Sequence, residues 1–131
     1  MKLFYLIISI ALVFAISTGN VHSQTCKTID SSQLIPAEPD ENDAITLELA
    51  GTWCVSVADV ASQWDVAKKT ITVDVTVTSG FLQILSSWNT TVPLGTLRHG
   101  MYTLEVRLHD ASTGQLVDQK SLTVRVRKKN K

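Results

Sequence analysis

Few side chains in this sequence are of the types that do chemistry. Beyond residue 23 the histidines are His99 and His109, and neither forms a His-x-x-x-His pair or joins carboxylates at metal-ligand spacing. Serine, histidine and aspartate occur, but not in Gly-x-Ser-x-Gly or another nucleophile motif, and there is no glycine-rich phosphate loop. We therefore expect no enzyme activity, no metal and no cofactor. We expect both histidines to lie on the surface.

Cysteine occurs twice, as Cys26 and Cys54. In an exported domain such a pair is most simply one disulfide, which contributes on the order of 3 kcal/mol. The bond would pin a flexible entry segment to the first core strands. The alternatives are two free thiols, or Cys54 as a small buried hydrophobic residue.

Three tryptophans are the residues best able to form a binding site. Trp53, next to Cys54, is expected in the core, and Trp88 is expected to cover the end of a sheet. Trp64 lies in an irregular segment and is the candidate for an exposed contact. Asn89 begins the glycosylation sequon Asn-Thr-Thr, which matters only in a eukaryotic source.

The N-terminus has the pattern of a secretory signal peptide. Lys2 precedes an apolar run over residues 3–16, and Val21 and Ser23 stand at the −3 and −1 positions of a cleavage site. The run is shorter than the roughly 18 apolar residues that a spanning helix needs. We predict removal of residues 1–23, no remaining integral membrane segment, and a secreted or extracytoplasmic protein.

Charge is balanced overall but uneven along the chain. Lys and Arg number 12, Asp and Glu number 12, and the net charge is +0, which gives no support for a nucleic-acid partner. Acids gather in residues 24–43 and bases near the C-terminus, including the basic tail at 128–131. Both are expected to be solvated, and the sharper alternative is a tail that contacts lipid headgroups or acidic polysaccharide.

The elements that would position these residues are strands. Residues 24–43 read as an extended lead-in with an edge strand at 32–35, because Pro36 excludes a central strand. Period-two alternation predicts further strands at 44–50, 53–57, 70–78, 81–87, 88–95, 102–108 and 121–127, with a bulge or bend at Gly51. Residues 59–69 are ambiguous: they fit one or two amphipathic helical turns ending in a turn at Lys68-Lys69. Residues 110–114 read as a hairpin loop.

One corner organises this pattern. Leu97 is expected to plug the core, Gly100 permits the turn, and Tyr102 starts a strand with its hydroxyl bonded back to upstream backbone. That device is the tyrosine corner of immunoglobulin-like sandwiches. We predict an all-β fold: a two-sheet antiparallel sandwich of immunoglobulin or fibronectin-III type, with about seven strands over residues 44–127. A small barrel is the alternative.

Three stretches carry a family resemblance: Ile-Thr-Leu-Glu-Leu-Ala-Gly-Thr-Trp-Cys at 45–54, Thr-Ile-Thr-Val at 70–73, and the run from Trp88 to Val106 with its Leu-Gly-x-Leu-x-x-Gly-x-Tyr. The chain resembles small exported bacterial immunoglobulin-like domains of mostly uncharacterised function. Members often pair the cysteine after Gly-x-Trp with one in the strand matching 81–85. This chain has none there, so Cys54 pairs with Cys26 or stays free.

These observations predict an exported, non-catalytic module that binds through loops or an open sheet edge. The partner would be a surface, a protein or a glycan of unknown identity, contacted by one or two aromatic anchors on a rigid scaffold. Two other functions fit the same pattern. One is a secreted protease inhibitor that uses residues 59–69 or 110–114, and the other is a structural subunit whose strand edge completes another sheet.

Overall fold

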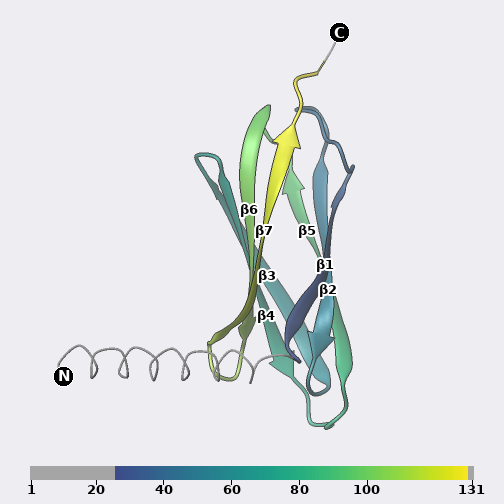
Figure 1. The fold of residues 1–131 in the computed structure, drawn as a ribbon. Helices are drawn as coiled ribbons and strands as arrows, with labels where there is room; N and C mark the ends of the chain where they lie inside the picture. Colours follow the sequence, from purple (N-terminus) through teal and green to yellow (C-terminus); the bar gives the residue numbers. More distant parts are fainter. Residues whose placement is uncertain (1–25, 130–131) are drawn as a thin grey trace, which may run out of the picture.

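A computed structural model describes residues 26–129, which form seven β-strands in two layers and contain no helix (Figure 1). The first sheet has the order β1-β2-β5 and the second has the order β3-β4-β6-β7. The strands are β1 (Thr28–Ile35), β2 (Ile45–Trp53), β3 (Val57–Ala67), β4 (Thr70–Ser79), β5 (Ser86–Gly95), β6 (Gly100–Asp110) and β7 (Leu116–Val126). The expected signal peptide, residues 1–23, lies outside the described residues.

The core forms where alternate side chains of both sheets meet. In β4 the four inward residues are fully buried, and β6 supplies three more at the matching register. β-branched side chains at alternate positions suit a pleated sheet with one buried face. Period-two burial is therefore confirmed for the strands where it was clearest. These seven residues are Ile71, Val73, Val75, Val77, Leu104, Val106 and Leu108.

The expectation that both sheets are antiparallel is wrong for one pair. β4 and β6 run parallel, with Thr70 opposite Thr103 and Val77 opposite Asp110, so the second sheet is mixed. The chain leaves β4, crosses to the first sheet as β5 and returns as β6. Two reversals of direction separate β4 from β6, so the strands point the same way. The other pairs are antiparallel.

Two local expectations are also wrong. Residues 59–69 do not form helical turns, because Val57–Ala67 is the edge strand β3, hydrogen-bonded to β4 over its length. Backbone hydrogen bonds to β4 stabilise this segment as a strand, and the weak helical spacing of its apolar residues is not enough to compete with them. The expected turn at Lys68 is confirmed, with a φ of 59°. Residues 81–85 form a loop, and the next strand begins at Ser86.

The start of the sandwich is more regular than expected. β1 begins within the predicted lead-in and is an edge strand that ends before Pro36, as the proline required. β2 runs without interruption to Trp53, so Val55 and Val57 do not continue it. Gly51 lies within β2, and the irregularity in pairing falls on β1, between Ile29 and Ser31.

The hydrogen bond expected from Tyr102 to upstream backbone is confirmed. The Tyr102 hydroxyl donates to the carbonyl of Arg98 at 2.8 Å, and Leu97 joins the core. Gly100 has a φ of 148°, and a Cβ there would lie 2.7 Å from Lys69 Nζ. The Lys69 ammonium lies 4.7 Å from the Tyr102 ring centroid, so the corner also holds the β3–β4 turn.

Candidate functional site

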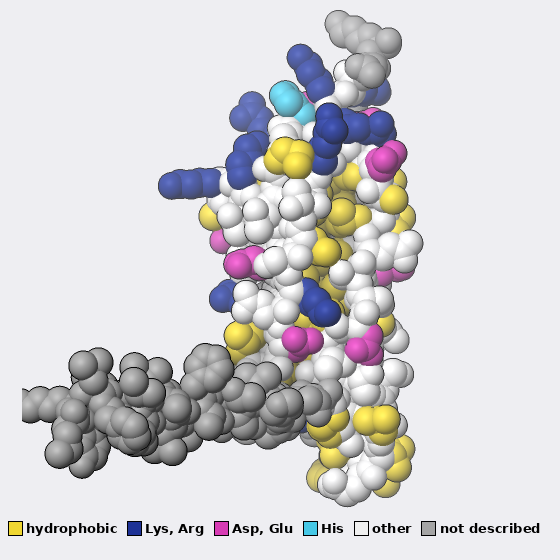
Figure 2. Space-filling model, in the orientation of Figure 1, with side chains coloured by type: hydrophobic (Ala, Val, Ile, Leu, Met, Phe, Trp, Pro, Cys, Tyr) yellow, Lys and Arg dark blue, Asp and Glu magenta, His cyan; other side chains and the backbone are white. Residues whose placement is uncertain are grey.

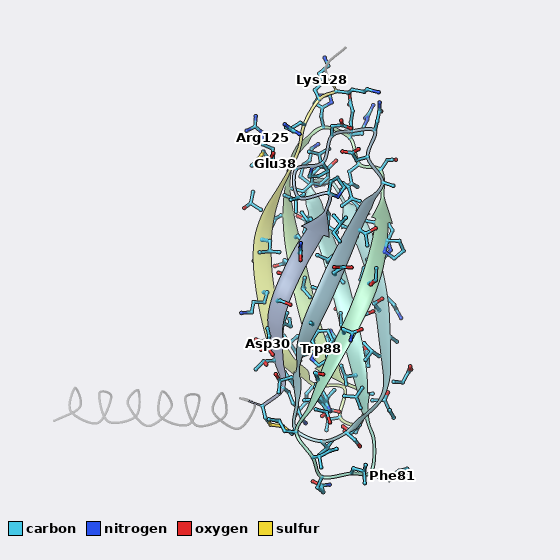
Figure 3. All side chains as sticks on the ribbon, turned by 90° about the vertical axis from the view of Figure 1, so that its right-hand side faces the viewer. Asp30, Glu38, Phe81, Trp88, Arg125 and Lys128 are labelled. Carbon is cyan, nitrogen blue, oxygen red and sulfur yellow. A yellow bond between two sulfur atoms is a disulfide. The ribbon has the colours of Figure 1, made fainter. Side chains whose placement is uncertain are left out.

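The loop between β4 and β5 exposes apolar side chains at one end of the sandwich. We call residues 80–85 the apolar tip. Phe81 is fully exposed at 101%, and Leu82, Ile84 and Leu85 are 55–72% exposed. These four are half of the eight large hydrophobic side chains exposed among residues 26–129. Figure 3 shows Phe81 at the extreme end of the molecule, and Figure 2 shows yellow side chains around that end. Exposed clusters of this kind mark interaction sites.

The apolar tip is held in place by Ser56. The Gly80 amide donates to the Ser56 carbonyl at 2.7 Å, and the Ser56 amide donates to the Leu82 carbonyl at 2.9 Å. The Leu82 amide donates to Ser56 Oγ at 3.0 Å. A Cβ at Gly80 would crowd Ser56 Oγ, so a larger residue would displace the hydroxyl that holds the Leu82 amide. Phe81 therefore stands between two anchored residues, and its loop is preorganised for contact.

The confirmed Cys26–Cys54 disulfide lies beside this clamp. It joins the start of β1 to the end of β2, with a Cα–Cα distance of 5.1 Å and a sequence separation of 28. Cys54 lies two residues before Ser56, so the bond restrains the segment that holds the apolar tip. A disulfide of this kind indicates an oxidising, extracytoplasmic environment.

A second interaction restrains the same end of β1. Lys27 Nζ lies 2.6 Å from Asp110 Oδ2 and 5.1 Å from the Trp53 ring centroid. Asp110 is 3% exposed and also accepts hydrogen bonds from the amide and hydroxyl of Ser112. Burial by itself would raise the pKa of Asp110, but the hydrogen bonds from Lys27 and Ser112 outweigh it and hold that pKa below its usual value.

The opposite end of the sandwich is basic, and we call it the basic pole. It combines the β3–β4 turn, the β5–β6 corner and the end of β7; Figure 2 shows dark blue side chains there, and Figure 3 places Arg125 and Lys128 far from Phe81. Its cations are Lys68, Lys69, Arg98, Arg125, Arg127, Lys128 and Lys129. Within residues 26–129, none of them has a carboxylate within ion-pair distance.

Three acids at the basic pole, namely Asp40, Glu41 and Asp43, have other partners. Glu41 Oε2 lies 2.9 Å from His99 Nδ1, and Glu41 Oε1 accepts the Lys129 amide at 3.3 Å. The contact with His99 lowers the pKa of the Glu41 carboxyl, and the Lys129 amide adds to it. Asp40 and Asp43 accept backbone amides within their own turn. Arg127 donates to the Glu38 carbonyl at 3.1 Å and Lys69 lies over the Tyr102 ring, but neither is neutralised by a carboxylate within residues 26–129, so the positive charge of the basic pole can attract an external anion.

A polar cluster lies on the outer face of the second sheet. Asp74 Oδ1 is 2.9 Å from His109 Nε2 and 3.0 Å from Arg107 Nε, and Arg107 Nη2 donates to Asp74 Oδ2 at 3.3 Å. The contact of Arg107 Nε with Asp74 is within ion-pair distance but lacks hydrogen-bond geometry, so this buried nitrogen has no hydrogen-bond partner. A groove of about 440 Å³ lies beside Asp74 and His109 and reaches Gln63 on β3. Arg107 and His109 both already contact Asp74, so the cluster has the arrangement of a structural ion pair rather than of a reactive centre.

The other predicted site residues lie apart from one another. Trp64 is 41% exposed on edge strand β3, near the turn at Lys68 and outside the apolar tip. Its role as a contact stays a prediction. Asn89 is exposed on β5 opposite Ala50, so its sequon is accessible. Trp53 is buried, as expected, and Trp88, which was expected to cover the end of a sheet, is also buried in the core.

The apolar tip lies mostly within the strand predicted at 81–87, which is why the pattern of residues did not reveal it as an exposed loop. A signal was present: Phe81 and Leu85 have one parity, and Leu82 and Ile84 have the other. A half-buried strand is apolar at one parity only. Apolar residues at both parities, just after Ser79-Gly80, argue against a half-buried strand, although a fully buried strand would show the same pattern.

Among residues 26–129, no group of His, Cys, Asp or Glu is placed to hold a metal ion. The same part of the chain has no helix long and apolar enough to cross a membrane. Comparison with known proteins finds no matching family model, curated protein or solved structure.

Proposed function

We propose that this chain is a secreted, non-catalytic β-sandwich module that binds an apolar surface through its apolar tip. The observation that carries the proposal is Phe81, fully exposed between two residues anchored to Ser56. A rigid aromatic anchor loses little conformational entropy on binding and excludes much apolar area from water. Secretion is supported by the signal-peptide pattern and by the disulfide.

The proposed relation to immunoglobulin-like domains rests on the corner at Tyr102 and on two packed sheets of three and four strands. The parallel β4–β6 pair departs from the antiparallel pattern of that fold. We therefore propose a variant of the immunoglobulin-like sandwich. A non-catalytic role is supported by the lack of nucleophile and metal-site motifs in the sequence.

Retention on phenyl-substituted agarose tests the proposed function. We expect Phe81→Asp to elute from a falling ammonium sulfate gradient clearly before the wild type. The matched control is Met101→Asp, which places the same charge on another exposed apolar residue, 55% exposed and at the opposite end of the sandwich. Equal shifts for the two variants would refute a dedicated site at the apolar tip.

A second candidate function is supported by the unpaired cations of the basic pole. Such a cluster fits an acidic polysaccharide. On immobilised heparin we expect Arg125→Ala combined with Lys128→Ala to lower the eluting salt concentration. The control Lys120→Ala removes an exposed cation from within β7. If Lys120→Ala lowers the eluting salt concentration as much per charge removed as the double variant does, then net charge explains the retention. The basic pole would in that case not be a specific site.

A further inference from the structure

We propose that the partner of the apolar tip is a lipid bilayer, into which the tip inserts to a shallow depth without spanning it. The inference rests on the proposed function, because it names the apolar surface that the tip binds. Three observations at this end of the molecule favour lipid: the partly satisfied backbone of the loop, its lack of charge, and the crowding of four exposed apolar side chains into five residues.

Several backbone groups on either side of Phe81 already have internal partners. Both polar groups of Leu82 are hydrogen-bonded to Ser56, as is the Gly80 amide. The carbonyl of Ile84 accepts the Ser86 hydroxyl at 3.1 Å. Unpaired backbone groups oppose transfer into hydrocarbon, where no water can replace the lost hydrogen bonds. The clamp thus removes part of the cost of taking this loop out of water.

The loop also lacks charge. No Asp, Glu, Lys or Arg occurs between Asp74 and Arg98, and Gln83 is the one polar side chain between Phe81 and Leu85. A charge on the tip would oppose its entry into the bilayer core. The uncharged stretch of the chain therefore coincides with the end that the fold exposes.

The exposed apolar side chains of the tip are crowded together. Phe81, Leu82, Ile84 and Leu85 occupy four of five consecutive loop positions and are all exposed, and Figure 2 shows yellow side chains on both sides of this end. A protein pocket that holds one anchor would leave the others in water. A fluid hydrocarbon layer surrounds a convex end from all sides and buries all four side chains together.

The basic pole gives a sharp way to test this geometry. It lies at the other end of strands such as β4, whose 10 residues span roughly 30 Å. Electrostatic attraction decays over about 8 Å at physiological salt. With the apolar tip in the bilayer, the basic pole is too far from the headgroups to contribute. Binding should then depend on Phe81 and not on lipid charge.

The test is co-sedimentation with vesicles of pure phosphatidylcholine, then of phosphatidylcholine containing one-third phosphatidylglycerol. The protein is recovered after export, with its N-terminus checked by mass spectrometry so that an apolar leader cannot anchor it. We expect binding to pure phosphatidylcholine, about ten-fold weaker partitioning for Phe81→Asp and for Leu85→Asp, and wild-type partitioning for Met101→Asp. Phosphatidylglycerol or 0.5 M salt should change wild-type binding less than two-fold.

A second measurement reports insertion directly. In Phe81→Trp, the added fluorescence should shift to shorter wavelength on binding and be quenched by phosphatidylcholine brominated along its acyl chains. An unchanged Phe81→Trp spectrum, or binding that requires phosphatidylglycerol and is lost in salt, would overturn the insertion model. Equal unfolding midpoints for all variants show that the fold is retained, as expected for exposed positions.

The two proposals fail in different ways. Phe81-dependent retention on phenyl agarose without binding to phosphatidylcholine overturns the bilayer and leaves the proposed function standing with a protein partner. Loss of both overturns both. Sedimentation that shows a dimer broken by Phe81→Asp overturns the bilayer in favour of a second copy of this chain.

Discussion

Breaking the Cys26–Cys54 bond should destabilise the protein by an amount that the chain topology sets. The cysteines are 28 positions apart, and the bond holds the start of edge strand β1 against the end of β2. In the chain-entropy description, removing a cross-link of this loop length lowers the free energy of unfolding by about 3.5 kcal/mol. This loss is a large fraction of the total free energy of unfolding, which is roughly 5–15 kcal/mol for a typical domain.

Urea unfolding followed by tryptophan fluorescence measures this loss, because Trp53 and Trp88 are buried in the folded state. The oxidised protein is compared with the reduced protein and with the double variant Cys26→Ala, Cys54→Ala. The last two should agree with each other. Their m-value should exceed that of the oxidised form, since the open unfolded chain exposes more surface.

The same change should weaken the apolar tip beyond its effect on global stability. Cys54 restrains the segment that carries Ser56, and Ser56 anchors Gly80 and Leu82. Hydrogen exchange at the Leu82 amide should accelerate on reduction even where the protein stays folded. A stability loss below about 1 kcal/mol, or unchanged exchange at Leu82, would refute the view that the disulfide restrains both β1 and the tip.

Two further perturbations test the packing. Gly51→Ala should lower the free energy of unfolding in urea by about 2–5 kcal/mol, because the new Cβ would lie 1.9 Å from the Thr28 carbonyl and 2.5 Å from Trp88 Nε1, which donates to that carbonyl. Gly114→Ala adds only the strain of an alanine at a φ of 73°, since its Cβ meets nothing within 4 Å, and a cost of Gly51→Ala no larger than that strain would contradict the steric clash. Asp110→Asn should destabilise the protein at pH 7 by about 3 kcal/mol, since it removes the charge that pairs with Lys27. Because the folded-state pKa of Asp110 is lowered, the stability it contributes is present above its unfolded value near 3.8 and lost as pH falls through the folded-state value. The gap in unfolding free energy between wild type and variant should therefore narrow below about pH 4, and a constant gap from pH 7 to pH 3 would count against the ion pair.

The end-to-end polarity of this sandwich has a simple consequence for binding. The apolar tip and the basic pole lie at opposite ends, so one flat surface cannot contact both (Figure 3). If both proposals hold, the module bridges an apolar layer and an anionic polymer. Vesicles and heparin added together would then bind the same molecule at the same time.

Local pattern was enough for much of the fold. Alternating valines and isoleucines identify β4, because burial of one pleated face depends on every second residue. The hydrogen bond from Tyr102 to upstream backbone and the turn at Lys68 depend on a few consecutive residues, and both are confirmed. The disulfide was one of several open possibilities until the fold brought Cys26 beside Cys54.

Tertiary structure decided what depends on distant partners. Whether β4 runs parallel to β6 depends on which sheet β5 joins, and no local spacing encodes that choice. Residues 59–67 became a strand because β4 offered a free edge. The cations of the basic pole come from separate turns, and Phe81 is exposed because its loop projects past both sheets. The alternation of apolar and polar residues along a strand indicates which side chains can share a face. The pairing of strands that are distant in the sequence determines which faces are covered and which remain in water.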